Sequence, residues 1–122
     1  MRKSLFAFVL IASGVLFAFV PPKDRNIGRW KAKYGNDMRG IVEFKADGTF
    51  ETSFENSDFK VGGIYITRDD VLYIADTSCK ENYWGKYRQI FFSDDSVLNN
   101  VLEDSCSGRR ASADKAVLIR MN

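Results

Sequence analysis

The stretch NIGRWKAKY, residues 26–34, places a Gly-x-Trp motif at the start of a segment with a period of two. Trp30 and Tyr34 fall on one face of an extended chain, while Lys31 and Lys33 fall on the other. Alternation of this kind predicts a β-strand with one buried face and one face in water. Residues 27–34 are therefore predicted to form the first strand of the fold.

The same alternation recurs in seven further segments, most of them separated by short turn signals. Asp47-Gly48 is one such signal, because this pair readily supplies the positive φ that a tight hairpin requires. Polar triplets such as Ser93-Asp94-Asp95 mark others. The predicted strands cover residues 27–34, 40–45, 49–55, 59–67, 71–76, 84–92, 96–104 and 116–122.

An all-β chain of eight sequential antiparallel strands must protect its edges, since unpaired edges invite aggregation. Closure into an up-and-down barrel removes the edges, so this is the predicted fold. A two-sheet β-sandwich is the alternative. No segment after residue 20 has a helical period, and residues 106–115, CSGRRASADK, are predicted to form a polar loop before the last strand.

The N-terminal segment, residues 1–20, has a basic start followed by an apolar run over residues 5–20. The run is shorter than the ~20 residues of a membrane-spanning helix, and it is typical of a signal peptide. No Ala-x-Ala site precedes Pro21-Pro22, so an uncleaved N-terminal anchor is the alternative. Residues 21–26 would then be a short linker and residues 27–122 one domain, secreted or periplasmic, or anchored outside the cytoplasm.

The charge balance excludes nucleic acid as a partner. Removing residues 1–20 takes away Arg2 and Lys3, which leaves 18 − 2 = 16 basic residues against 16 acidic ones. A neutral domain has no excess of cations with which to displace the counterions of phosphates. Membrane contact is expected only through the N-terminal segment, if that segment is retained, and the oligomeric state is not predicted.

Cys79 and Cys106 are the two cysteines of the chain. In an exported protein the simplest interpretation is one disulfide between them. A metal site would need more soft ligands than two cysteines. A reactive thiol would lack its usual imidazole base, because the chain has no histidine. We therefore predict a disulfide, no metal site and no cofactor.

The adjacent aspartates of the chain are interpreted as turn residues and not as catalytic residues. Asp69-Asp70 and Asp94-Asp95 are adjacent carboxylates in predicted turns, where exposure leaves the carboxyl pKa without a reason to rise. With no histidine for proton transfer near neutral pH, we expect no enzymatic activity.

A second acidic group lies close to the cysteines in sequence. Asp76, Glu103 and Asp104 carry the oxygen ligands that calcium prefers, but they lack the spacing of a calcium-binding loop. We favour the alternative that Asp76 and Asp104 accept hydrogen bonds from turn backbone beside the disulfide.

Gly28-x-Trp30 on the first strand and Arg120 on the last resemble the calycin superfamily, and within it the small bacterial lipocalin-like proteins. The runs EFKADGTF (43–50) and GIYIT…VLYI (63–74) are similar to hairpins of that group, and the cysteine pair resembles a disulfide variant. The resemblance implies that Trp30 packs across one barrel end beneath Arg120, a cation–π contact of about 0.5–2 kcal/mol. The alternative is that Trp30 is simply a large core residue.

The resemblance and the alternation together predict a ligand site inside the barrel. The inward aromatic set is predicted to be Trp30, Tyr34, Phe44, Phe50, Phe54, Tyr65, Tyr87 and Phe91. Polar side chains among aromatics suit a small hydrophobic or amphipathic molecule, which would be held without catalysis. The candidate ligand-binding residues are Tyr34, Thr52, Phe54, Tyr65, Tyr87, Gln89 and Asn100.

The alternative is a packed extracytoplasmic interaction module with no small-molecule ligand. Its contacts would be the loop 106–115, with Arg109 and Arg110, and an apolar patch formed if the outward side chains include Ile41, Ile64, Ile66, Val71 and Tyr73. A void of a few hundred Å³ would favour the binding protein, and a solid interior would favour the module.

Overall fold

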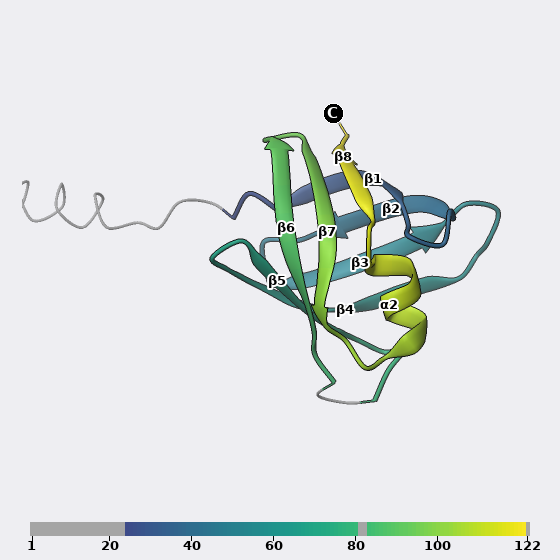
Figure 1. The fold of residues 1–122 in the computed structure, drawn as a ribbon. Coiled ribbons are helices and arrows are strands. Elements are labelled where there is room, and N and C mark those ends of the chain that lie inside the picture. Colours follow the sequence, from purple (N-terminus) through teal and green to yellow (C-terminus); the bar gives the residue numbers. More distant parts are fainter. Residues whose placement is uncertain (1–23, 81–82, 122) are drawn as a thin grey trace, which may run out of the picture.

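The computed structural model describes residues 24–80 and 83–121, and within them eight antiparallel strands form a closed barrel in chain order (Figure 1). Each strand pairs with the next, and the last returns to pair with the first, so the predicted barrel is confirmed and the sandwich is not formed. The strands are β1 (Gly28–Lys33), β2 (Arg39–Phe44), β3 (Thr49–Phe54), β4 (Lys60–Arg68), β5 (Val71–Asp76), β6 (Gly85–Ser93), β7 (Ser96–Glu103) and β8 (Val117–Arg120).

The predicted signal peptide or anchor at residues 1–20 lies outside the described residues. In residues 24–80 and 83–121, no helix has both the length and the apolar character required to cross a bilayer.

The hairpin turns follow from residues that tolerate a left-handed backbone. Asp69 and Asp70 form the two-residue turn between β4 and β5, with φ of 53° and 60°. Two successive positive φ values are typical of a type I′ turn, whose twist matches that of the flanking strands. Gly48 has φ of 87° at the Asp47-Gly48 turn. The adjacent aspartates are therefore turn residues, as the sequence pattern predicts.

The inner face of the barrel carries the aromatic set that alternation predicts. Phe44 and Tyr65 meet edge to face at 4.9 Å between ring centroids, and Tyr34 and Phe54 lie 5.0 Å apart. Tyr34, Phe44 and Tyr65 are buried, and Phe54 is partly buried and packs against the core. Trp30, Phe50 and Tyr87 are also buried, while Phe91 is partly buried against them.

One end of the barrel is closed by Trp30 and Arg120, which are Cα partners in the β1–β8 pairing. The Trp30 ring is 0% exposed, and Cζ of Arg120 lies 4.2 Å from its centroid. The Trp30 Nε1 donates a hydrogen bond to the Asn26 carbonyl at 2.9 Å. Nη1 of Arg120 donates to the Ile27 carbonyl at 2.8 Å. The guanidinium therefore covers the indole and also fixes the segment that leads into β1.

Gly28 makes room for this contact. Its φ is 134°, a conformation that residues with a side chain rarely adopt. A Cβ at this position would lie 2.8 Å from Nη1 of Arg120. Both fixed residues of the Gly-x-Trp motif therefore contribute to the contact. Gly28 leaves space for the Arg120 guanidinium, and Trp30 provides the ring on which that guanidinium stacks.

Asn26 extends the closed end beyond the predicted domain boundary. The sequence pattern assigns residues 21–26 to a linker, yet the Asn26 side chain is fully buried. Its Nδ2 donates to Gln89 Oε1 at 2.9 Å and to Thr67 Oγ1 at 3.0 Å, and Gln89 Nε2 donates back to Asn26 Oδ1 at 2.7 Å. This amide pair makes Asn26 part of the barrel.

The segment 106–115, predicted as a loop, contains the short helix α2 (Ser107–Ala113), which contacts β7 and leads into β8 (Figure 1). The prediction is wrong here for a physical reason. A helix is recognised in sequence by an apolar stripe, and the buried residue of α2 is the charged Arg109. A seven-residue helix with a polar buried side chain has no such stripe.

Replacing Trp30 by alanine is expected to lower the free energy of unfolding by about 3–5 kcal/mol, because the change removes a fully buried side chain. Urea unfolding followed by circular dichroism measures the loss. Phe92→Ala is the control, since Phe92 is 67% exposed and its removal should change stability by about 0.5 kcal/mol or less. Equal losses in the two variants would contradict the closing role of Trp30.

Candidate functional site

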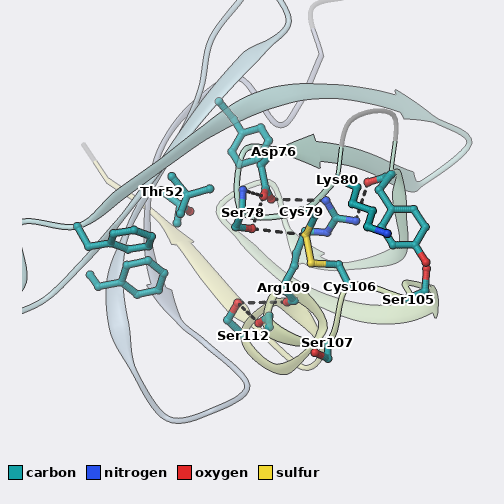
Figure 2. Close-up of a pocket in the computed structure, with 16 residues that line it drawn as sticks. Thr52, Asp76, Ser78, Cys79, Lys80, Ser105, Cys106, Ser107, Arg109 and Ser112 are labelled. Atoms are coloured by element: carbon teal, nitrogen blue, oxygen red, sulfur yellow. Dashed lines mark hydrogen bonds and ion pairs between the residues drawn. A yellow bond between two sulfur atoms is a disulfide. The ribbon is translucent and has the colours of Figure 1, made fainter.

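A pocket of about 1020 Å³ opens at the end of the barrel away from Trp30, where β3 and β5 end and β4 and β6 begin (Figure 2). One wall comes from β3, β4 and the segment between them, and it is apolar and aromatic. Phe54 and Phe59 stack there with 6.1 Å between ring centroids. Phe50, Thr52 and Val61 line the pocket from the inner face of the barrel.

The facing wall is mainly polar and comes from the end of β5, the β5–β6 connection, the segment before α2 and α2 itself. It contributes hydroxyl groups, one lysine amine and the disulfide (Figure 2). A molecule in the pocket would therefore meet aromatic carbon on one side and hydrogen-bonding groups on the other. The residues of the polar wall include Asp76, Ser78, Lys80, Ser105, Ser107 and Ser112.

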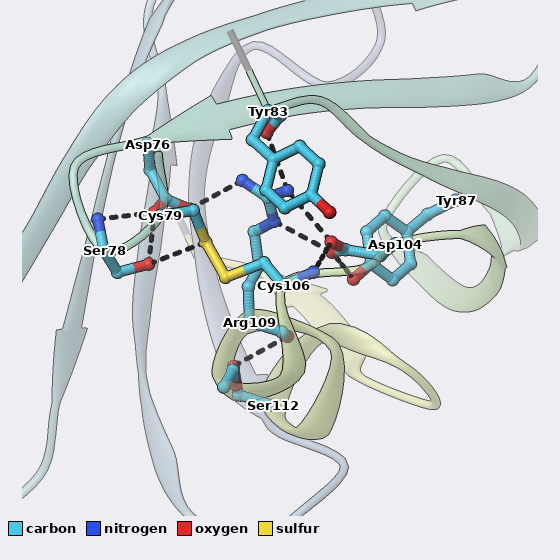
Figure 3. The surroundings of a disulfide bond; sticks show 10 residues. Asp76, Ser78, Cys79, Tyr83, Tyr87, Asp104, Cys106, Arg109 and Ser112 are labelled. Atoms are coloured by element: carbon cyan, nitrogen blue, oxygen red, sulfur yellow. Dashed lines mark hydrogen bonds and ion pairs between the residues drawn. A yellow bond between two sulfur atoms is a disulfide. The ribbon is translucent and has the colours of Figure 1, made fainter. Parts of the chain in front are cut away.

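The predicted disulfide joins Cys79 to Cys106 across this wall, with 6.0 Å between their Cα atoms (Figure 3). Cys79 follows β5, and Cys106 is the residue before α2. The bond thus ties the β5–β6 connection to the start of the helix. Both cysteines line the pocket.

Arg109 of α2 anchors the polar wall from beneath (Figure 3). Its Nε and Nη2 donate to the two carboxylate oxygens of Asp104 at 2.8 and 2.9 Å, and Nη2 also donates to the Tyr83 carbonyl at 2.8 Å. Nη1 lies 3.6 Å from Oδ2 of Asp76 and donates no hydrogen bond within the described part of the chain. One guanidinium therefore connects the ends of β5 and β7 with the segment before β6.

The sequence pattern places Arg109 and Arg110 together in an exposed partner-binding loop, and this is wrong for Arg109. The Arg109 side chain is 4% exposed, while Arg110 is exposed on the helix surface. The local sequence does not show which of the two arginines is buried, because Asp104 precedes both closely and Asp76 belongs to a distant segment of the chain.

Asp104 holds Arg109 and is itself held by Tyr87, whose hydroxyl donates to Oδ2. Burial alone would raise the pKa of Asp104, but the hydrogen bonds from Arg109 and Tyr87 outweigh burial and hold this pKa below its usual value. Burial and the neighbouring carboxylate raise the pKa of Tyr87. Gly85 allows this packing, since a Cβ there would lie 2.5 Å from Asp104 Oδ2.

Asp76 and Asp104 accept backbone hydrogen bonds beside the disulfide, as the sequence predicts. Asp76 Oδ1 accepts from the Ser78 N–H at 2.9 Å, and Asp104 Oδ1 accepts from the Cys106 N–H at 3.0 Å. Both carboxylates also face Arg109, which the sequence did not reveal. Across residues 24–80 and 83–121 no three histidine, cysteine or acidic side chains are grouped as a metal site would require.

The structure brings part of the predicted ligand-binding set to the pocket. Thr52 and Phe54 line it. Tyr34 packs against Phe54, and its hydroxyl donates to the Ser53 carbonyl at 2.9 Å. Tyr87 lies beneath the polar wall through its bond to Asp104.

Two predicted ligand-binding residues belong elsewhere in the barrel interior. The Tyr65 hydroxyl donates to the Lys45 carbonyl at 2.7 Å, and Gln89 pairs with Asn26. These hydrogen bonds satisfy polar groups near the closed end. Neither side chain lines the pocket.

Asn100 is not on the inner face. Its Oδ1 accepts a hydrogen bond from Lys115 Nζ at 2.8 Å at the surface, and the buried amide is its neighbour Asn99. Both parities of β7 carry aliphatic residues, so alternation does not decide between the two asparagines. The residues concerned are Val97 and Val101 on the inner parity, and Leu98 and Leu102 on the outer one.

No protein-family model matches the sequence, and a search of the curated proteins finds no match. Among solved structures, the chain is similar to the NMR structure of a protein from Bacteroides uniformis ATCC 8492, with a TM-score of 0.52 and 20% sequence identity. The match covers 83% of this chain and 93% of that chain. At this identity the likeness shows a shared small barrel fold.

Asp104→Asn is expected to lower the free energy of unfolding by about 3–5 kcal/mol at pH 7, because it leaves the buried Arg109 charge without its carboxylate. The folded-state pKa of Asp104 is lowered, so its contribution is present above the unfolded pKa of about 4 and is lost as the pH falls further. Urea unfolding of both proteins across pH 2–7 measures this. The difference should shrink in acid, and a constant difference would contradict the ion pair.

Reduction of the Cys79–Cys106 bond is expected to cost about 3–4 kcal/mol of stability, from the loop entropy of a 27-residue separation. Thermal unfolding with and without reductant measures the effect. A variant with serine at both positions serves as the control, since reductant should not change its melting temperature. An unchanged melting curve for the native protein would show that the bond adds nothing.

Proposed function

We propose that this chain is an exported, lipocalin-like small barrel that binds a small amphipathic molecule in the pocket at its open end, without catalysing a reaction. The observation that carries the proposal is the division of the pocket into an aromatic wall and a polar wall. Ligand sites are typically apolar concavities with a few placed polar groups. The pocket has this composition, and its volume of about 1020 Å³ is that of a small-molecule site.

The position of the pocket limits how deeply a ligand could enter the barrel. The barrel interior is filled by packed aromatic side chains, so a ligand would lie at the rim and reach inward only as far as Phe50, Thr52 and Val61. The apolar part of the molecule would rest on Phe54 and Phe59. Its polar part would face the hydroxyl groups and Lys80 across the opening.

The exposure of Phe59 favours a small-molecule-binding barrel over a packed interaction module with no ligand. The Phe59 ring is 60% exposed at the pocket edge, although exposed phenylalanine is costly in water. It stacks on Phe54 and leaves the rest of its surface to the pocket. An aromatic side chain held in this way is suited to covering an apolar ligand.

A non-catalytic role is consistent with the chemistry of the pocket. The chain has no histidine, and both cysteines are in the disulfide. Asp76, the acidic side chain that lines the pocket, is directed toward Arg109. Export is supported by the same disulfide, since such bonds persist in oxidising compartments.

A fluorescent apolar probe, N-phenyl-1-naphthylamine, tests the proposal. We expect saturable binding with a fluorescence increase, and Phe59→Ala should weaken it about 5- to 10-fold through loss of apolar contact and ring stacking. Phe92→Ala is the matched control, because Phe92 is as exposed but does not line the pocket. Absence of saturable binding, or equal weakening by both variants, would contradict the proposal.

A further inference from the structure

The barrel has a second cavity on its outer surface, where β8, β1 and β2 meet. This groove has a volume of about 640 Å³ and is also lined by residues 53–55 at the end of β3. It adjoins the open-end pocket at Phe54, which lines both. We name the outer surface of β8, β1 and β2 the seam face, because it covers the closure of the barrel. Its outward residues in the groove are the cations Lys31, Lys33 and Arg39 and the aliphatic residues Ile41, Val117 and Ile119.

The strand register alternates charge and apolar surface across the seam face. Lys31 of β1 has Ile119 of β8 on one side and Ile41 of β2 on the other. In the next outward row, Lys33 lies between Val117 and Arg39. Each lysine stem therefore runs beside aliphatic side chains and can extend its amine beyond them.

The cations that line the groove outnumber its acidic residues and are not paired with them in the part of the molecule that the structure describes, although Glu43 of β2 also lies on the outer surface of these strands. Within residues 24–80 and 83–121, Lys31, Lys33 and Arg39 form no ion pair, and Glu55 is the acidic residue that lines the groove. Ile119, on the β8 side of the face, is 54% exposed. Unpaired cations next to exposed aliphatic side chains are complementary to a partner that carries negative charge and apolar groups.

We propose that the seam face docks on an anionic lipid surface. The aliphatic side chains would enter the boundary between headgroups and acyl chains, while Lys31, Lys33 and Arg39 would contact lipid phosphates. This contact uses outward side chains that do not line the ligand pocket, and it would add to contact through the N-terminal segment if that segment is retained.

A second copy of the chain fits this face poorly. Apposing two seam faces would bring the three groove cations of one molecule against three of the other, with one acidic lining residue, Glu55, on each side. Repulsion between the like charges would then outweigh the attraction. A lipid surface supplies both the negative charge and the apolar interior that the face lacks.

Vesicle flotation with the full-length chain, as expressed and processed, tests the docking. Phosphatidylcholine vesicles with and without one quarter phosphatidylglycerol are compared at low salt. We expect at least tenfold tighter binding to the anionic vesicles. The double variant Lys31→Gln/Lys33→Gln should lose about 25-fold, at roughly fivefold for each basic residue, and Ile119→Ser should lose about tenfold.

Two variants on other strands are the matched controls. Lys60→Gln removes a cation that is already paired with Glu51, and Ile64→Ser removes an outward isoleucine of β4 that is 48% exposed. Neither should change the preference for anionic vesicles, and all variants share the same N-terminal segment. Equal binding to both vesicle types, or full binding by the lysine double variant, would overturn the proposal. Self-association that Ile119→Ser abolishes would assign the face to a second copy instead.

Discussion

The contact of Arg120 with Trp30 is the constraint on which the barrel depends. β8 has only four residues and pairs with β7 over three of them, so its backbone ladder is a short one with which to close a barrel. Arg120 adds hydrogen bonds to the carbonyls of residues 25, 27 and 94 and an ion pair with Asp95. One side chain thus fastens the last strand to segments from both halves of the chain.

Most of the fold can be predicted from sequence because the inner face is marked by aromatic residues at a period of two. Six of the eight aromatics predicted to point inward are buried, and the other two pack against the core. The prediction fails where both parities are apolar, as on β7, where Asn99 and not Asn100 is buried. Alternation shows that every second residue shares a face, but it does not show which of the two faces points inward. Packing against the neighbouring strands decides that.

The polar wall of the pocket was largely hidden from the sequence for a different reason. The burial of Arg109 depends on Asp104 and Asp76, and on a helix too short and too polar to have an apolar stripe. The available signals were the proximity of Asp104, Cys106 and Arg109 in sequence and the glycine at position 85. Neither identifies a buried ion pair, because charged residues in a polar segment are ordinarily exposed.

The two ends of the barrel are built by different chemistry, and the pocket lies at the end away from Trp30. The closed end is filled by an indole and paired amides, which leave little room. At the other end a disulfide and a buried guanidinium connect the segments that surround the pocket. A buried ion pair is a weak source of stability, since desolvation cancels much of its attraction. We therefore interpret Arg109 as a residue that fixes the segments around the pocket relative to one another.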